Sequence, residues 1–266
     1  MKKVIRITSW VLLSICIIVL LGFVKNQHDK MPCNKVDIVI EENDDANFIN
    51  RNDILQTAYD KGDSLIGQPL KSIDIKGLEM TYLQNPSIEK AQVSESIDGE
   101  IKIYVKQRTP MLRIINYKND SYYIDIEGNL MPLSESYTAR VLVATGFIIE
   151  SYANTYSLDL LSRDINDTLL TKFIIDDLYL LAKYINESEF WKAQIAQIYI
   201  NADREIELIP VFGNHRILLG DATNLRDKFN KLLVFYIEGL NKTGWNVYTK
   251  INLKYKNQVV CTKAQQ

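Results

Sequence analysis

The chain begins with one long apolar stretch. Residues 7–24, ITSWVLLSICIIVLLGFV, carry no charged side chain. A helix of about 18 residues, rising about 1.5 Å per residue, nearly crosses the hydrocarbon of a bilayer. We therefore predict a single transmembrane helix over 7–24, preceded by a tail of residues 1–6 and followed by a polar linker over 25–35.

The charges around this stretch favour one orientation. Lys2, Lys3 and Arg6 precede it, and a tail this short does not readily cross a membrane, so the N-terminus is predicted to be cytoplasmic. A cleaved signal peptide is the alternative. Residues 21–25 offer no Ala-x-Ala pattern for cleavage, which favours an uncleaved anchor.

The next part of the chain alternates between two periodicities. Apolar positions repeat at strand spacing, then twice at helical spacing, then twice more at strand spacing. The predicted order is strand, helix, helix, strand, strand, over residues 36–40, 50–62, 74–84, 88–96 and 100–106.

The last two strands of this group are joined by a strong turn signal. Asp98-Gly99 is the dipeptide that two-residue hairpins prefer, and apolar and polar residues alternate through 100–106. This βααββ order resembles the small POTRA (polypeptide-transport-associated) domain, which we place over 36–107.

The remaining pattern is rich in strands with flanking helices, which makes the fold class α+β. Residues 167–186 have an apolar stripe at helical spacing, which either packs on the core or docks a partner. We further predict a helix over 222–240 capped by Asp221, and strands over 195–200, 206–210, 215–220, 247–255 and 258–262. This second domain is expected over 108–262, with a tail over 263–266.

Composition narrows the classes of function. The 31 basic and 33 acidic residues nearly cancel, so the sequence lacks the charge signature of a nucleic-acid binder. Cys16, Cys33 and Cys261 are too few for a disulfide framework. A bridge between Cys33 and Cys261 would need an oxidising compartment.

Residues for catalysis are scarce. The only histidines are His28 and His215, and the sequence contains no Gly-x-Ser-x-Gly, His-Glu-x-x-His or Cys-x-x-Cys motif. We predict no catalytic residues, no metal site, no cofactor and no small-molecule substrate.

A resemblance to a known family rests on the order of several loose motifs. An anchor and a POTRA-like domain are followed by a strand that closes in Val-Lys-Gln-Arg-Thr-Pro at 105–110. The segments 110–114, 121–128, 131–134 and 139–146 then resemble the first strands of the β domain of the bacterial division protein family FtsQ/DivIB, in the manner of its Bacteroidota members. Nearly the whole chain takes part.

The resemblance implies a non-enzymatic scaffold of the divisome. It implies partners such as the bitopic proteins FtsB and FtsL and other divisome components. It also implies a single-pass protein of the inner membrane at the division septum, with most of the chain periplasmic.

The resemblance also implies a binding site near the C-terminus. Leu253-Lys254-Tyr255 is similar to the family's terminal Leu-Arg-Tyr strand, where FtsB joins the sheet, and Val259 and Val260 lie in the following segment. Tyr255 either contacts the partner or simply packs on the sheet.

Arg108 and Pro110 mark the predicted interdomain junction. Arg108 either orients the two domains through a bond to a carbonyl or carboxylate, or is a solvated strand end.

Two other classes of function remain open. POTRA-like domains also occur in chaperones and assembly factors for exported or outer-membrane proteins, although only one copy is predicted here. An anchored envelope hydrolase would need a cluster of polar catalytic residues that the sequence does not show.

Overall fold

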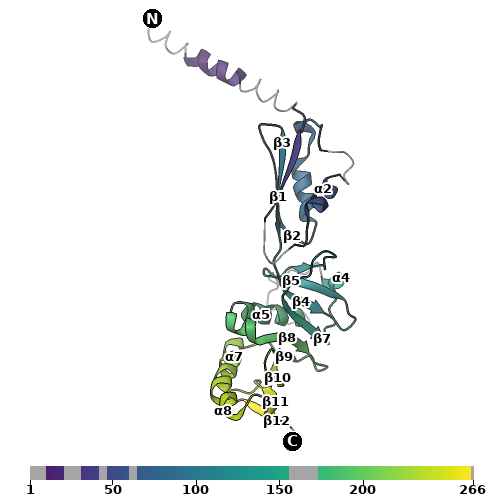
Figure 1. Cartoon of the computed structure of the whole chain (residues 1–266). Coiled ribbons are helices and arrows are strands. Elements are labelled where there is room, and N and C mark those ends of the chain that lie inside the picture. Colours follow the sequence, from purple (N-terminus) through teal and green to yellow (C-terminus); the bar gives the residue numbers. More distant parts are fainter. Residues whose placement is uncertain (1–9, 21–30, 42–46, 60–64, 156–172, 265–266) are drawn as a thin grey trace. The chain divides into compact units, whose positions relative to one another are not determined.

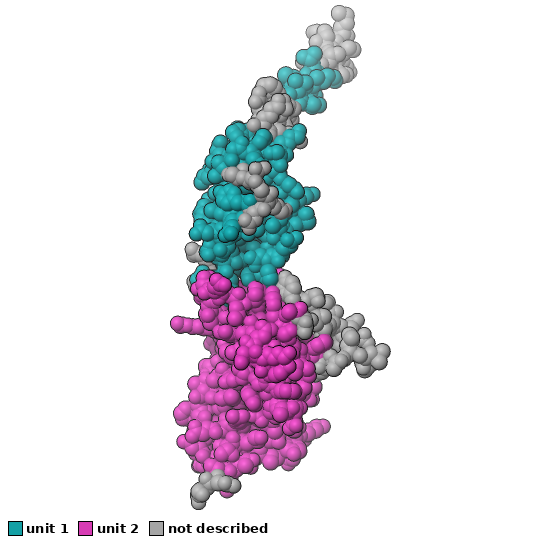
Figure 2. All heavy atoms as spheres, turned by 90° about the vertical axis from the view of Figure 1, so that its right-hand side faces the viewer, with its two compact units in different colours: residues 1–43, 47–107 teal, residues 44–46, 108–266 magenta. Residues whose placement is uncertain are grey.

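The computed structural model describes residues 10–20, 31–41, 47–59, 65–155 and 173–264. The chain forms two compact units, one of residues 1–43 with 47–107 and one of residues 44–46 with 108–266 (Figure 2). Residues 10–20 form a helix with exposed side chains, and the rest of the predicted span 7–24 lies outside the described residues. Within the described ranges, no helix is both long and apolar enough to cross a membrane.

Apart from the helix over residues 10–20, the first unit has a three-stranded sheet with two α-helices (Figure 1). Its elements are β1 (Lys35–Ile40), α2 (Arg51–Tyr59), a 3₁₀ turn η1 (Leu70–Ser72), α3 (Ile75–Leu83), β2 (Ile88–Glu95) and β3 (Glu100–Gln107). The sheet order is β1-β3-β2, with β1 parallel and β2 antiparallel to β3. The predicted βααββ order is therefore confirmed.

Two glycines of this unit occupy positions where a Cβ would not fit. The hairpin between β2 and β3 places Gly99 at φ +81°, a conformation that side chains with a Cβ rarely adopt. At the start of α3, Asp74 accepts a hydrogen bond from Gly77 N at 3.0 Å. A Cβ at Gly77 would lie 2.3 Å from Asp74 Oδ2, so the glycine leaves room for this cap.

The second unit is built on a nine-stranded sheet. Its strands are β4 (Pro110–Ile115), β5 (Ser121–Asp125), β6 (Leu130–Met131), β7 (Leu142–Gly146), β8 (Ile195–Ile200), β9 (Ile206–Pro210), β10 (Arg216–Gly220), β11 (Tyr248–Asn252) and β12 (Val260–Lys263). Their order in the sheet is β12-β11-β10-β9-β8-β7-β4-β5-β6. The pairs β4/β7, β7/β8 and β10/β11 are parallel, and the others are antiparallel.

Helical segments accompany this sheet. They are α4 (Tyr152–Thr155), α5 (Ile174–Asn186), α6 (Glu189–Gln194), α7 (Leu225–Val234), a π-helix η2 (Phe235–Leu240) and α8 (Asn241–Thr243). Apolar side chains of α5, α7 and η2 share one core with the strands, and α5 and α7 lie along the same side of the sheet (Figure 1). The predicted helix 167–186 is described only from residue 173, and there its apolar stripe is buried in the core.

The predicted helix 222–240 needs a correction. α7 begins at Leu225, after Asn224 in a left-handed conformation, and the chain changes to π-helical geometry from Phe235. Asp221 does not cap the helix. It accepts hydrogen bonds from Thr223 N at 3.0 Å and from Lys228 Nζ at 2.7 Å. The carboxylate is therefore used to close the loop between β10 and α7.

Candidate partner-binding edge

β12 forms one end of the nine-stranded sheet. Of the strands that the structure describes, it pairs with β11 alone, with Ile251 opposite Cys261 and Asn252 opposite Val260. The main-chain groups of Thr262 face β11, because the Thr262 carbonyl accepts a hydrogen bond from Thr249 Oγ1. Two residues further along, Ala264 N likewise donates to Val247 O. In an antiparallel pair, successive residues face alternate sides. The main-chain groups of Cys261 and Lys263 therefore face the open side of the sheet.

The opposite end of the sheet offers much less. β6 has only two residues, Leu130 and Met131, and both are buried. In β12, by contrast, three of the four residues are exposed. Among the described strands of this unit, β12 is therefore the edge best suited to accept another strand.

The predicted strand 247–255 is too long. β11 ends at Asn252, whose side-chain oxygen accepts a hydrogen bond from Lys254 N at 3.0 Å. This local bond turns the chain out of the ladder, as Asn side chains often do. β11 also has a neighbour on each side, β10 and β12, so it is not an edge strand.

The three residues after β11 have different surroundings. Leu253 is completely buried in the core, and its N–H donates to Leu218 O at 2.9 Å. Lys254 forms an ion pair with Glu205. This hydrogen-bonded pairing raises the pKa of the Lys254 ammonium. Tyr255 is 48% exposed. Of the three, Lys254 and Tyr255 are accessible to a partner, and their role in binding stays a prediction.

The turn between β11 and β12 is held by a side chain that the sequence did not reveal. Lys231 on α7 donates from Nζ to the carbonyls of Leu253 and Tyr255, at 2.8 and 2.6 Å. Its partial burial lowers the pKa of its ammonium group, with a further contribution from nearby Lys228. The bonds place the turn against α7, so α7 helps to position the edge.

The two predicted valines lie on either side of the start of β12. Val259 packs against the core, while Val260 is the first residue of β12 and is 45% exposed. Beside Val259, an open groove of about 570 Å³ is lined on the α7 side by Val234 and Phe235. The groove therefore lies next to the segment that leads into β12.

The sequence signal for the true edge is the segment after Asn257. Asn257 has φ +58°, a conformation that Asn tolerates in turns, and a β-compatible run follows it. A turn and a second arm after β11 indicate a terminal hairpin, whose outer arm is β12. The predicted strand 258–262 corresponds to β12 and contains Cys261, but the resemblance places the binding site at Leu253, Lys254, Tyr255, Val259 and Val260. Cys261 and Lys263 are therefore not among the predicted site residues.

The junction residues belong to a separate cluster. Arg108 Nη1 lies 2.8 Å from Asp125 Oδ2 and 3.4 Å from Glu127 Oε2, so its guanidinium is paired within the second unit. Asp125 also accepts from the N–H groups of Glu127 and Asn129, at 2.9 and 2.7 Å. Pro110 is buried at the start of β4, opposite Asp125.

The described residues do not assemble a metal site. They contain no group of three His, Cys, Asp or Glu side chains placed to hold a metal ion. His215 is buried, which lowers its pKa, although a main-chain bond at Trp245 acts in the opposite direction. Its Nε2 lies 3.3 Å from the Tyr236 hydroxyl, and its ring packs against Tyr236 and Trp245. This is the environment of a core histidine. The three cysteines are free thiols.

Comparison with known families agrees with this architecture. The family model described as FtsQ/DivIB, C-terminal related matches residues 109–262, which is more than half of the chain. The chain belongs to the FtsQ/DivIB family. A second model, for a POTRA-like domain, matches residues 31–106. No curated protein matches the chain significantly. FtsQ/DivIB proteins are cell-division proteins, so the resemblance inferred from the motifs is confirmed at the level of the family.

Proposed function

We propose that this FtsQ/DivIB protein is a non-enzymatic, single-span scaffold of the divisome that captures a bitopic partner by strand addition to β12. The observation that carries the proposal is the position of β12 at the end of the nine-stranded sheet, where β11 is its only neighbour among the described strands. An edge strand of this kind provides main-chain hydrogen bonds to an incoming strand.

The geometry of β12 defines what a partner would contact. The outward N–H and C=O groups of Cys261 and Lys263 would pair with the main chain of the partner. Lys254 and Tyr255, in the turn beside the edge, would contact its side chains. By family resemblance the partner is FtsB, together with FtsL. The exposed valine of β12 and the apolar groove beside it favour a partner strand with apolar residues on one face.

The N-terminal segment supports an anchoring role. Residues 10–20 are helical and expose a continuous series of large apolar side chains, which water does not solvate well. We propose that residues 7–24 form one span, with the N-terminus in the cytoplasm and both compact units in the periplasm. The protein would then link division proteins at the septum.

The decisive test is capture of the partner from membranes by full-length protein carrying Cys261→Pro. Proline removes one N–H that faces the open side, and this N–H is not used in pairing with β11. We expect the small bitopic partner to be lost, while the variant keeps its circular dichroism spectrum and its membrane fraction. Cys261→Ser is the matched control, because it removes the thiol but keeps the N–H.

The other outcomes decide against specific parts of the proposal. A folded Cys261→Pro protein that retains the partner would place the interface away from β12. Equal loss in Cys261→Ser would indicate that the thiol, and not strand addition, matters. If wild-type protein captures no bitopic division protein, the scaffold proposal is wrong.

A further inference from the structure

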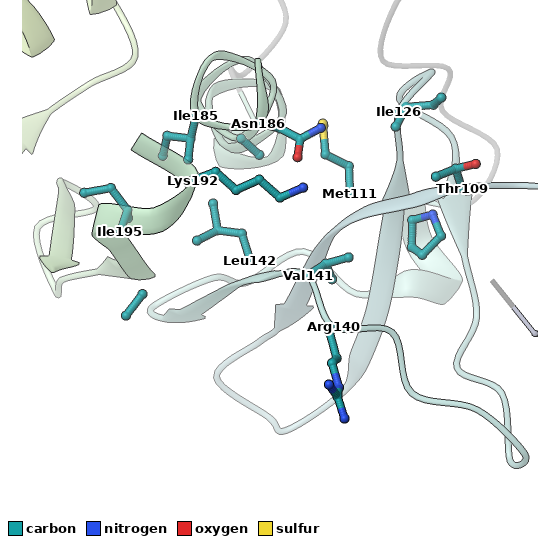
Figure 3. Close-up of a pocket in the computed structure, with 13 residues that line it drawn as sticks. Thr109, Met111, Ile126, Arg140, Val141, Leu142, Ile185, Asn186, Lys192 and Ile195 are labelled. Atoms are coloured by element: carbon teal, nitrogen blue, oxygen red, sulfur yellow. The ribbon is translucent and has the colours of Figure 1, made fainter. Parts of the chain in front are cut away.

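A second candidate surface lies in the same unit as β12 but on different strands. A pocket of about 300 Å³ opens where three parallel strands begin, at Pro110 in β4, Leu142 in β7 and Ile195 in β8. Ala182, Ile185 and Asn186 at the end of α5 form another wall (Figure 3). The volume is at the lower end of the range for ligand sites, which suits one or two side chains rather than a large cofactor.

The pocket exists because β7 starts late. β4 pairs with β7 only from Leu112, and β8 pairs with β7 only from Gln197, so the first two residues of β4 and of β8 have no partner in β7. Each of these two strands also has a register shift on its other side, at Met111 and at Ala196. Both of these residues line the pocket. Bulges bend strands and redirect side chains, and they are common beside functional sites.

The lining of the pocket combines an apolar floor with cationic side chains. The buried apolar residues of the floor are Pro110, Met111, Ala182, Ile185 and Ile195, and the more accessible apolar lining residues are Ile126, Val141, Leu142 and Ala196. The charged lining residues are both cations, Arg140 and Lys192, and neither has an ion-pair partner among the described residues.

The positions of the charged groups indicate which end of the pocket attracts an anionic ligand. In Figure 3 the Lys192 side chain crosses the pocket below the Asn186 amide and ends near Met111, while Arg140 extends outward from the rim. The acids near the Ile126 end are Asp125 and Glu127, and Arg108 pairs with both of them. A carboxylate would therefore be attracted toward Lys192.

We propose that this pocket binds an extended acidic peptide segment of a partner protein, with a leucine-sized side chain on the apolar floor and a neighbouring Asp or Glu carboxylate at Lys192. Burial of one such side chain and a charge-assisted hydrogen bond are each favourable, and together they explain why an apolar floor and an unpaired cation share one cavity. The site is independent of β12, so the protein would hold two partner segments at once.

The test uses full-length protein in detergent and fluorescence anisotropy. The probe is a capped, labelled peptide of glycine and serine with one central Leu-Glu pair, and its controls replace Glu by Gln or Leu by Ser. We expect the probe to bind at least about tenfold more tightly than either control peptide. Lys192→Glu should weaken the binding at least about tenfold, and Ala196→Trp, which fills the pocket from an exposed position, should abolish it.

Arg226→Glu is the matched control variant. It makes the same change of charge at an exposed residue of α7, outside the pocket, and should bind the probe as wild type does. Cys261→Pro should also bind normally, which separates this site from the β12 proposal. Equal binding of the Leu-Glu peptide and its Gln analogue, or wild-type affinity in Lys192→Glu, would overturn the inference. Full competition by inorganic phosphate, without dependence on the leucine, would reduce the site to a simple anion site and also overturn it.

Discussion

Each of the two units has a sheet with an outer antiparallel strand, but the outward main-chain groups of the two strands have different surroundings. In the first unit, β2 is an outer strand, and Val93 N donates to Glu79 Oε1 of α3 at 2.8 Å. An N–H that could receive another strand is therefore already bonded to a carboxylate of the same unit. In the second unit, no described side chain bonds to the outward main-chain groups of β12.

Position at the end of a sheet therefore does not by itself make a binding edge. Natural proteins protect exposed edges with charged side chains and other devices. Glu79 is such a device, because a partner strand would have to displace it. β12 is short and carries Lys263, which limits nonspecific pairing, but its N–H groups remain available.

The largest effect is expected at the turn that leads into β12. Leu253→Ala should lower the free energy of unfolding by about 2–5 kcal/mol, because it creates a cavity at a completely buried site. The matched position in the β2–β3 turn is Ile97, which is 83% exposed. Ile97→Ala should cost less than about 0.5 kcal/mol. Urea unfolding of both variants measures the difference, and similar losses would contradict a core-anchored turn at β12.

Removal of the protecting carboxylate is expected to have the next largest effect. Glu79→Ala should lower the free energy of unfolding by about 1–3 kcal/mol, since Val93 N–H loses its charge-assisted bond. It should also increase self-association through β2, measured by sedimentation velocity. Glu79→Gln keeps an acceptor and should lose less. A Glu79→Ala protein that stays monomeric at high concentration would show that β2 is protected by other means.

A smaller effect is expected from Lys231, which holds the turn before β12. Lys231→Met keeps most of the aliphatic volume but loses the bonds to the carbonyls of Leu253 and Tyr255. We expect a loss of about 1 kcal/mol in the free energy of unfolding and faster amide exchange in β12. Lys242→Met is the control, since Glu238, on the surface, is the only ion-pair partner of Lys242 among the described residues. Unchanged exchange in β12 would show that Lys231 does not position the edge.

The smallest effect concerns the pH dependence of the loop before α7. Burial alone would raise the pKa of Asp221, but its bonds to Lys228 and Thr223 outweigh this and lower the pKa to about 2. Below about pH 4 the unfolded state then binds more protons than the folded state. The free energy of unfolding therefore decreases as the pH is lowered from about 4 toward 2. Because the carboxylate is 55% exposed, we expect Asp221→Asn to cost no more than about 1 kcal/mol at pH 6.

The measurement is urea unfolding of wild type and Asp221→Asn from pH 6 to pH 2.5. The difference in free energy between the two proteins should shrink as the pH falls toward 2, because Asp221 of the unfolded wild-type chain binds a proton at a higher pH than Asp221 of the folded chain does. A difference that stays constant over this range would contradict the assignment of the lowered pKa to Asp221.

The sequence was informative where one local signal dominated. The βααββ order, the Asp98-Gly99 hairpin and the strands β8 to β10 followed from periodicity and turn residues, and the structure confirms them. In each case the alternation of burial along a strand agrees with its turn chemistry, so sequence and tertiary structure do not conflict.

The sequence was less informative where distant residues decide the local structure. Alternation continues past Asn252 to Tyr255, but the Asn252 side chain ends the strand, and Lys231 from α7 holds the carbonyls that follow. Glu79 and Val93 lie in different elements, so their bond has no signature in either segment. The pocket at the start of β4, β7 and β8 forms because β7 starts later than its two neighbours. It therefore depends on three strands that are far apart in sequence.

The attachment of β12 to a single neighbour also affects how the sheet opens over time. For β12 to detach, the short ladder with β11, the bonds from Ala264 N to Val247 O and from Thr249 Oγ1 to Thr262 O, and the packing of Cys261 on the core have to break. This opening is expected to cost much less free energy than global unfolding. An open β12 would expose β11, whose main-chain groups are otherwise bonded on both sides. An incoming strand could thus pair with β12 or, after β12 has detached, pair with β11 in place of β12. The second route would be slower, because its rate would be limited by the opening of the terminal hairpin.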